Sequence, residues 1–180
     1  MFDIGLLAGR LIGVTRWLQT QPEAHGLPMG LLGASTGAAA ALWAAADLGD
    51  QIRAVVSRGG RPDLAGPRLV QVRAPTLLIV GGHDLAILDL NRHARARLGG
   101  PSALEVIGGA GHRFEEPGTL DRAAALAAAW FRHHLPHPDP PHPHPMAHHR
   151  PTPNDPTVPA PPGPAIPPSV GSKVGHLTVH

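Results

Sequence analysis

The sequence predicts an α/β fold in which helices cover both faces of a mostly parallel sheet. Short runs of β-branched and aliphatic residues alternate with stretches of helical periodicity over residues 1–135. These runs lack the polar/apolar alternation of a sheet with one solvated face, which indicates burial on both sides. The composition changes abruptly near Leu135, so we expect one folded domain, residues 1–135, and a separate segment, residues 136–180.

The predicted elements follow in order along the domain. Apolar residues from Ile4 to Leu18 recur at three- and four-residue steps, which predicts an amphipathic helix over residues 3–20. The alanine-rich stretch 35–48 predicts a helix buried against the sheet. Further helices are expected at 91–98 and 120–135, strands at 29–32, 52–57, 75–80 and 103–107, and a loop at 57–67.

The last 45 residues have a different composition. Seven of the 22 prolines lie in residues 1–135, which leaves fifteen for residues 136–180. Fixed φ angles, missing backbone donors and few large apolar side chains predict disorder with polyproline II character. Histidines are dense between 133 and 149, and imidazoles at this density can bind zinc, nickel or copper; a coil without supporting partners favours adventitious binding or plain low complexity.

Composition excludes several classes of function. The 180-residue chain has 15 Lys+Arg against 13 Asp+Glu, a net charge of +2 that gives no support to nucleic-acid binding. It has no cysteine, which excludes disulfides, thiolate-bound metals and a cysteine nucleophile. Residues 27–46 are uncharged, but glycines, a proline and alanines make a membrane helix unfavourable. The N-terminus lacks a basic leader, so we expect a cytoplasmic protein.

A G-x-S-x-G motif lies between the first predicted strand and the alanine-rich helix. In a nucleophile elbow the serine sits on a strained turn, and small neighbours avoid collision with the adjoining elements. The helix N-terminus favours negative charge, and the amide after the serine can donate to an oxyanion. The motif predicts Ser35 as nucleophile; a glycine-rich turn with a capping serine is the alternative. Its residues are Gly33, Ala34, Ser35, Thr36 and Gly37.

A serine nucleophile needs a base to take its proton and an acid to orient the base. Asp84 follows the strand 75–80 in the turn GGHD, and His112 follows the strand 103–107 in GGAGH. Both stand just past strand ends, and the order Ser, Asp, His is the one this kind of motif requires. These residues therefore predict an acid and a base for Ser35.

Other charged residues remain open as alternatives. Asp63, after an earlier strand, is the second choice for the acid, and Asp89 would replace Asp84 if the turn were shorter. His83 falls on the wrong side of the chain order. Arg58 and Arg61 could meet an anionic substrate but read more simply as solvated loop residues, and Glu115 and Glu116 are expected to flank the last helix and favour its dipole.

Four segments occur in the order GLLGASTGAAAAL, AVVSRGGRPDLAG, APTLLIVGGHD and GGAGHRFEEPG. They resemble the α/β-hydrolase superfamily, and more closely its dienelactone hydrolase-like branch, over roughly residues 2–135. The resemblance implies Ser35 as nucleophile, Asp84 as acid, His112 as base and the Thr36 amide as half of an oxyanion hole, with a small-molecule ester as substrate and no cofactor or metal. Relatives of this kind are sometimes joined to a phosphoribosyltransferase domain, for which the sequence shows no motif.

The sequence departs from this family in two ways. Dienelactone hydrolases use a cysteine nucleophile, so the serine makes the chain more similar to esterases. Family members also have a group of strands before the helix that opens this chain, with a loop that supplies the second oxyanion donor. We therefore expect a partial α/β-hydrolase fold with an open elbow strand.

The leading hypothesis is a serine hydrolase of carboxylic esters or related acyl compounds, weak or inactive alone unless an N-terminal half or self-association completes it. The alternatives are a non-catalytic remnant or split-enzyme half, and a metal-binding or interaction protein defined by its His/Pro tail.

Overall fold

The computed structural model describes residues 3–135 of the chain. The predicted disorder of residues 136–180, and almost all of the histidine-rich segment, lie outside these residues.

Four parallel strands form a single sheet in the order β1-β2-β3-β4. Each strand is joined to the next by a segment that contains a helix or a 3₁₀ turn, as parallel pairing requires. The strands are β1 (Met29–Ala34), β2 (Ile52–Arg58), β3 (Thr76–Gly81) and β4 (Ser102–Ile107).

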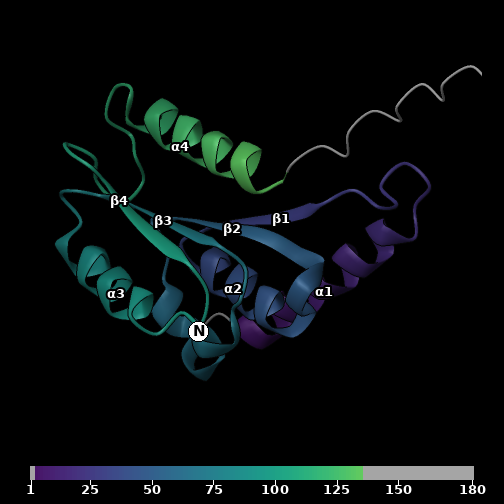
Figure 1. Ribbon diagram of the computed structural model, residues 1–180. Helices are drawn as coiled ribbons and strands as arrows, with labels where there is room; N and C mark the ends of the chain where they lie inside the picture. The colour runs from purple at the N-terminus through teal and green to yellow at the C-terminus, as the bar shows by residue number, and fades with distance from the viewer. Residues whose placement is uncertain (1–2, 136–180) are drawn as a thin grey trace, which may run out of the picture. The chain divides into compact units, whose positions relative to one another are not determined.

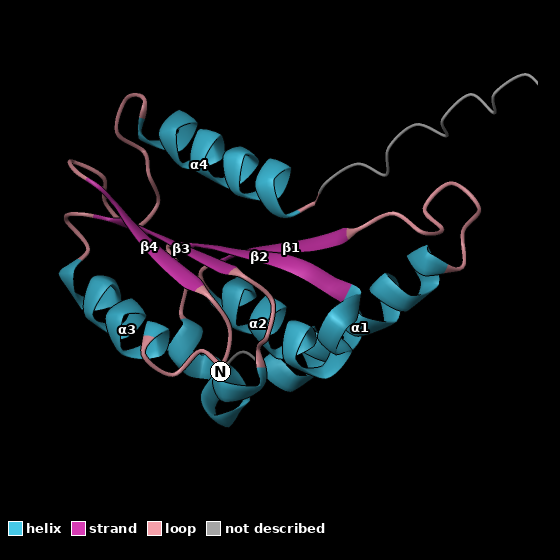
Figure 2. Cartoon of the chain, viewed as in Figure 1, coloured by secondary structure: helices cyan, strands magenta, loops and turns pink. Residues whose placement is uncertain are grey.

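Helices cover both faces of this sheet, which confirms the predicted fold class. The helix α4 (Thr119–His134) lies on one face of the sheet, and the helices α1 (Ile4–Gln19), α2 (Thr36–Leu48) and α3 (Leu85–Arg95) lie on the other (Figure 1). The sheet is therefore a middle layer between them (Figure 2). The 3₁₀ turns are η1 (Gly49–Gln51) and η2 (Pro62–Gln71).

The sheet separates two apolar clusters. On the α2 side, most alanines of α2 are buried, and their small side chains let the helix lie close to the sheet. On the α4 side, Val56, Ile79 and Ile107 pack against Phe114 and the alanines of α4. Every residue of β3 is buried, which confirms the two-sided burial predicted from the absence of alternation.

The helix α3 begins earlier than the sequence predicted. We expected a helix at 91–98, but it runs over Leu85–Arg95 because the Asp84 carboxylate accepts a hydrogen bond from the Ile87 amide and caps it. The 3₁₀ turn η2 similarly occupies much of the expected loop at 57–67.

Strand β1 lies at the edge of the sheet. Within residues 3–135 it pairs with β2 alone, and the side chain of Leu32 is 56% exposed. The strand that carries the G-x-S-x-G motif therefore has one open side. No helix in the same part of the chain is long and apolar enough to cross a membrane.

Candidate active site

The residues singled out in the sequence gather at one edge of the sheet. Because all four strands are parallel, the loops that follow them meet at the carboxyl ends of the strands. The loops after β1, β3 and β4 carry Ser35, Asp84 and His112. The loop after β2 lies between the loop that carries Ser35 and the loop that carries His112, and it contacts both of these loops.

Ser35 forms a sharp turn between β1 and α2. Its backbone has φ 51° and ψ −124°, a region that non-glycine residues rarely adopt. Such strain costs about 1–3 kcal/mol and persists only where surrounding structure imposes it. A Cβ on Gly33 would lie 2.6 Å from the Ala38 amide nitrogen, so only glycine fits there, whereas a Cβ on Gly37 would meet no atom within 4 Å.

The loop after β2 holds this turn in place. The Ser35 amide donates to the Arg58 carbonyl at 3.3 Å, and the Arg61 amide donates to the Ser35 carbonyl at 3.0 Å. The Ser35 side chain makes no capping hydrogen bond to α2, which argues against the alternative of a capping serine. The Thr36 amide is the first of α2, where backbone donors have no acceptor within the helix.

Asp84 and His112 form a hydrogen-bonded pair. His112 Nδ1 lies 2.7 Å from Asp84 Oδ2. Because a carboxylate only accepts, Nδ1 donates in this bond, and in the neutral imidazole Nε2 is then the nitrogen with the lone pair. The Asp84 side chain is 16% exposed and that of His112 is 42% exposed, so the imidazole is open to a substrate while its carboxylate partner is mostly covered.

Backbone contacts fix the loops that carry this pair. The Gly82 amide donates to the Ile107 carbonyl at 2.8 Å, and the His83 amide donates to the Ala110 carbonyl at 2.9 Å. A Cβ on Gly59 would lie 2.9 Å from the His112 carbonyl oxygen, so the loop after β2 also touches the histidine loop. Through its backbone amide, His83 therefore helps to hold the loop that carries Asp84 against the loop that carries His112.

Ser35 and His112 line the same pocket, whose volume is about 290 Å³. No hydrogen bond joins their side chains in the described residues. The remaining lining residues are Ala34, Arg58, Gly59 and Arg113.

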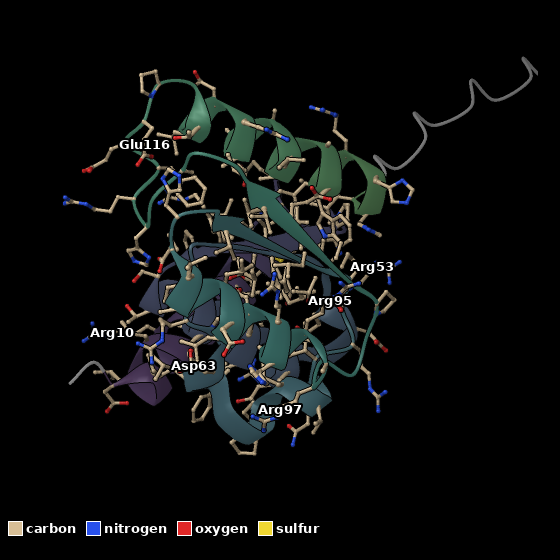
Figure 3. The ribbon with its side chains drawn as sticks, turned by 90° about the vertical axis from the view of Figure 1, so that its left-hand side faces the viewer. Arg10, Arg53, Asp63, Arg95, Arg97 and Glu116 are labelled. Carbon is tan, nitrogen blue, oxygen red and sulfur yellow. The ribbon has the colours of Figure 1, made fainter. Side chains whose placement is uncertain are left out.

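The alternative acids have other partners. Both carboxylate oxygens of Asp63 accept from Arg61, at 2.9 and 2.8 Å, and this pairing raises the pKa of Arg61. Figure 3 shows Asp63 on the side of the sheet opposite α4. Asp89 pairs with His93 on the exposed surface of α3. Neither carboxylate is hydrogen-bonded to His112 in the described residues.

Glu116 has a role that sequence reasoning missed. Its Oε1 accepts from the Gly111 amide at 3.0 Å, and this hydrogen bond lowers the pKa of Glu116. Glu116 flanks the start of α4 at Thr119, as the sequence predicted, and its carboxylate in addition holds the loop before His112. In Figure 3 Glu116 lies on the α4 side of the molecule.

No cluster of three or more His, Asp or Glu side chains that could hold a metal ion occurs within residues 3–135.

Comparison with known proteins identifies the fold. No protein-family model matches the chain. Dienelactone hydrolase from Anabaena variabilis is 53% identical to it, with a TM-score of 0.73, over 74% of this chain and 62% of that one. The fold of the chain therefore matches part of the fold of dienelactone hydrolase-like α/β-hydrolases. A dienelactone hydrolase-like promiscuous phosphotriesterase from metagenomic libraries shares the fold at 20% identity and a TM-score of 0.60, over 74% of this chain and 63% of that one.

Longer relatives occur among curated proteins. Two Mycobacterium tuberculosis proteins, from strains CDC 1551 and H37Rv, are both named "Putative phosphoribosyl transferase" and are 61% identical to this α/β-hydrolase-like chain over 140 residues. The match covers 78% of this chain and 32% of each relative, so the chain spans about a third of their length.

Proposed function

We propose that the chain is a serine hydrolase of α/β-hydrolase type that acts on carboxylic esters or related acyl compounds. The observation that carries the proposal is the 2.7 Å bond from Asp84 to His112, a histidine that lines the same pocket as the strained Ser35. A histidine whose Nδ1–H is held by a carboxylate presents a basic Nε2, and a serine on a strained turn beside it is positioned for attack.

The mechanism follows from these roles. His112 Nε2 takes the proton of Ser35 Oγ as Oγ bonds to the acyl carbon, and the Thr36 amide donates to the resulting oxyanion. When the bond to the leaving alcohol breaks, His112 returns the proton to its oxygen, which leaves an acyl group on Ser35. Water, deprotonated by His112, then releases the carboxylic acid and restores Ser35.

The proposal includes a completing segment beside β1. The matched dienelactone hydrolase extends beyond the 62% of its chain that this fold covers, and β1 has an open side. We place strands equivalent to that remainder along β1, supplied by the same longer polypeptide or by a separate one. Absence of one oxyanion donor lowers turnover by about a hundred- to a thousandfold. The chain alone is therefore a weak hydrolase in this proposal.

We do not propose phosphoribosyl transfer, the activity in the name of the mycobacterial relatives, as the function of this chain. The match covers 32% of each of them, so the printed name can refer to the two thirds that this chain does not match.

Hydrolysis of p-nitrophenyl esters of short carboxylic acids tests the proposal. Ser35→Ala should reduce the rate to that of the uncatalysed reaction, whereas the control Ser102→Ala, at the opposite end of the sheet, should retain the wild-type rate. Equal rates from wild type and Ser35→Ala would support a non-catalytic remnant instead.

A further inference from the structure

Arg58 occupies a defined place in the proposed active site. It is the last residue of β2 and pairs in register with Ala34, the residue before Ser35. Its carbonyl accepts from the Ser35 amide, so its backbone is fixed relative to the nucleophile. Arg58 lines the pocket that Ser35 and His112 also line. No carboxylate is among the lining residues of this pocket.

The guanidinium of Arg58 is held but has no anionic partner within residues 3–135. It lies over the ring of Phe114, 5.5 Å from the ring centroid. Other arginines near the strand ends are paired: Arg61 with Asp63, and Arg113 with Glu115. Stacking on an aromatic face orients a guanidinium while leaving its N–H groups able to donate to a ligand.

Phe114 is itself unusual. Its φ of 59° places it in the left-handed region, and it is only 2% exposed. Together with Ser35, it accounts for the positive-φ residues other than glycine in the described part of the chain. Strain of this kind concentrates at functional sites. With this backbone conformation, the ring of Phe114 lies in the core, beneath the Arg58 guanidinium.

A second groove meets the pocket at Arg58. It has a volume of about 180 Å³, and its other lining residues are all apolar, including Leu32, Ile79 and Leu120. Arg58 thus places a cation between an apolar groove and a pocket without carboxylates, where no described residue neutralises its charge.

We propose that Arg58 binds an anionic group of the substrate, a carboxylate or a phosphate, so that the hydrolase prefers anionic acyl compounds. The inference rests on the proposed function and deepens it. The anion lies within a few atoms of the scissile carbonyl, because Arg58 and the Ser35 turn are neighbours across adjacent strands. Arg113 is exposed and paired with Glu115, so it contributes less than Arg58 to binding of the anion.

A matched pair of esters measures this preference. The mono-p-nitrophenyl ester of glutaric acid carries a carboxylate, and the corresponding glutaramate ester is its neutral isostere. The ratio of kcat/KM for the anionic ester to that for the neutral ester should fall by about ten- to a hundredfold in Arg58→Met. Arg58→Lys should restore part of the ratio, because lysine keeps the charge but loses the planar donor fork.

Two further variants make this comparison decisive. Arg122→Met, an exposed arginine on α4, should leave the ratio at the wild-type value. A fall in Arg113→Met with no fall in Arg58→Met would overturn the assignment, as would a wild-type ratio of one or less.

Anion binding to the Ser35→Ala protein tests the anion site independently of ester hydrolysis. Glutarate and inorganic phosphate are titrated separately by calorimetry, which distinguishes the two anions. At least one should bind, and Arg58→Met in the same background should abolish its binding, even if the wild type hydrolyses no ester. Absence of binding by both anions, or equal binding with and without Arg58, would contradict the anion site.

Discussion

Ser35 adopts a backbone conformation that the rest of the site explains. Its turn is fixed by hydrogen bonds to Arg58 and Arg61, while Gly33 allows α2 to approach β1. The same few loops bring the Asp84–His112 pair to the Ser35 pocket. At this scale, backbone contacts between loops position the three side chains.

The identity of the acid can be tested by one comparison. Asp84→Asn should lower kcat by on the order of a thousandfold or more, or to the background rate, because an amide no longer holds His112 in the tautomer that leaves Nε2 free. Asp63→Asn should keep most of the activity, because Asp63 pairs with Arg61. Steady-state hydrolysis of a p-nitrophenyl ester measures both variants, and the opposite order of effects would reassign the acid to Asp63.

Glu116 should make stability depend on pH. Its pKa is lowered from the ordinary value of 4.5 by the hydrogen bond from the Gly111 amide, so the folded state favours the carboxylate. The resulting stabilisation is fully present above the unfolded pKa and is lost as the pH falls through the folded pKa.

Thermal unfolding of wild type and Glu116→Gln measures this contribution. The difference in Tm should be largest near pH 7 and smaller near pH 3, because the stabilisation is lost as the pH falls through the lowered pKa of the folded state. A difference of the same size at both pH values would show that the carboxylate charge is not the cause.

At the scale of elements, α3 is tied to the loop after β2. The fully buried Asn91 donates from its amide to the Gly60 carbonyl at 2.9 Å and to the Ile87 carbonyl at 2.8 Å. Gly60 packs against Ser57 and Ala38, near the start of α2. Asn91 thus connects the helix capped by Asp84 with the loop that holds the Ser35 turn.

Removal of this connection should destabilise the domain. Asn91→Ala leaves the buried Gly60 carbonyl without its donor and should lower the free energy of unfolding by about 2–4 kcal/mol. The control Arg92→Ala, exposed on the same helix, should change it by less than about 0.5 kcal/mol. Urea denaturation measures both, and similar values for the two variants would contradict the role given to Asn91.

The sequence predicted elements where a local signal existed. Apolar runs located all four strands within a few residues, and the alanine-rich stretch predicted α2 as a buried helix. The sequence does not show the start of α3, because the helix opens with the mainly apolar run LAILDL and its Asp84 cap also fits the place of a catalytic acid. Glu116 was missed because its acceptor role depends on a loop conformation that no spacing in the sequence specifies.

At the scale of the whole molecule, β1 is an edge strand whose open side has no neighbouring strand among the described residues. Leu32 is exposed on this strand, and an apolar groove of about 480 Å³ near its start is lined by Leu27, Phe131 and Leu135 among others. Edge strands with exposed apolar side chains tend to pair with other chains. The chain alone is therefore expected to associate through β1.

A charged residue on this strand should reduce the association. Leu32→Lys should lower the fraction of dimers and larger species in sedimentation velocity at a fixed concentration. Leu85→Lys, at an exposed position on α3, is the matched control and should leave the distribution unchanged. Equal association of wild type and Leu32→Lys would place the contact away from β1.

The central claim, that Ser35 is an activated nucleophile served by His112, is tested most directly by labelling with a fluorophosphonate probe. Intact-mass analysis should show one adduct on wild type, with peptide mapping to Ser35, and no adduct on Ser35→Ala or His112→Ala under the same conditions. Absence of labelling in a folded wild-type protein, or an adduct that persists in Ser35→Ala, would contradict the account.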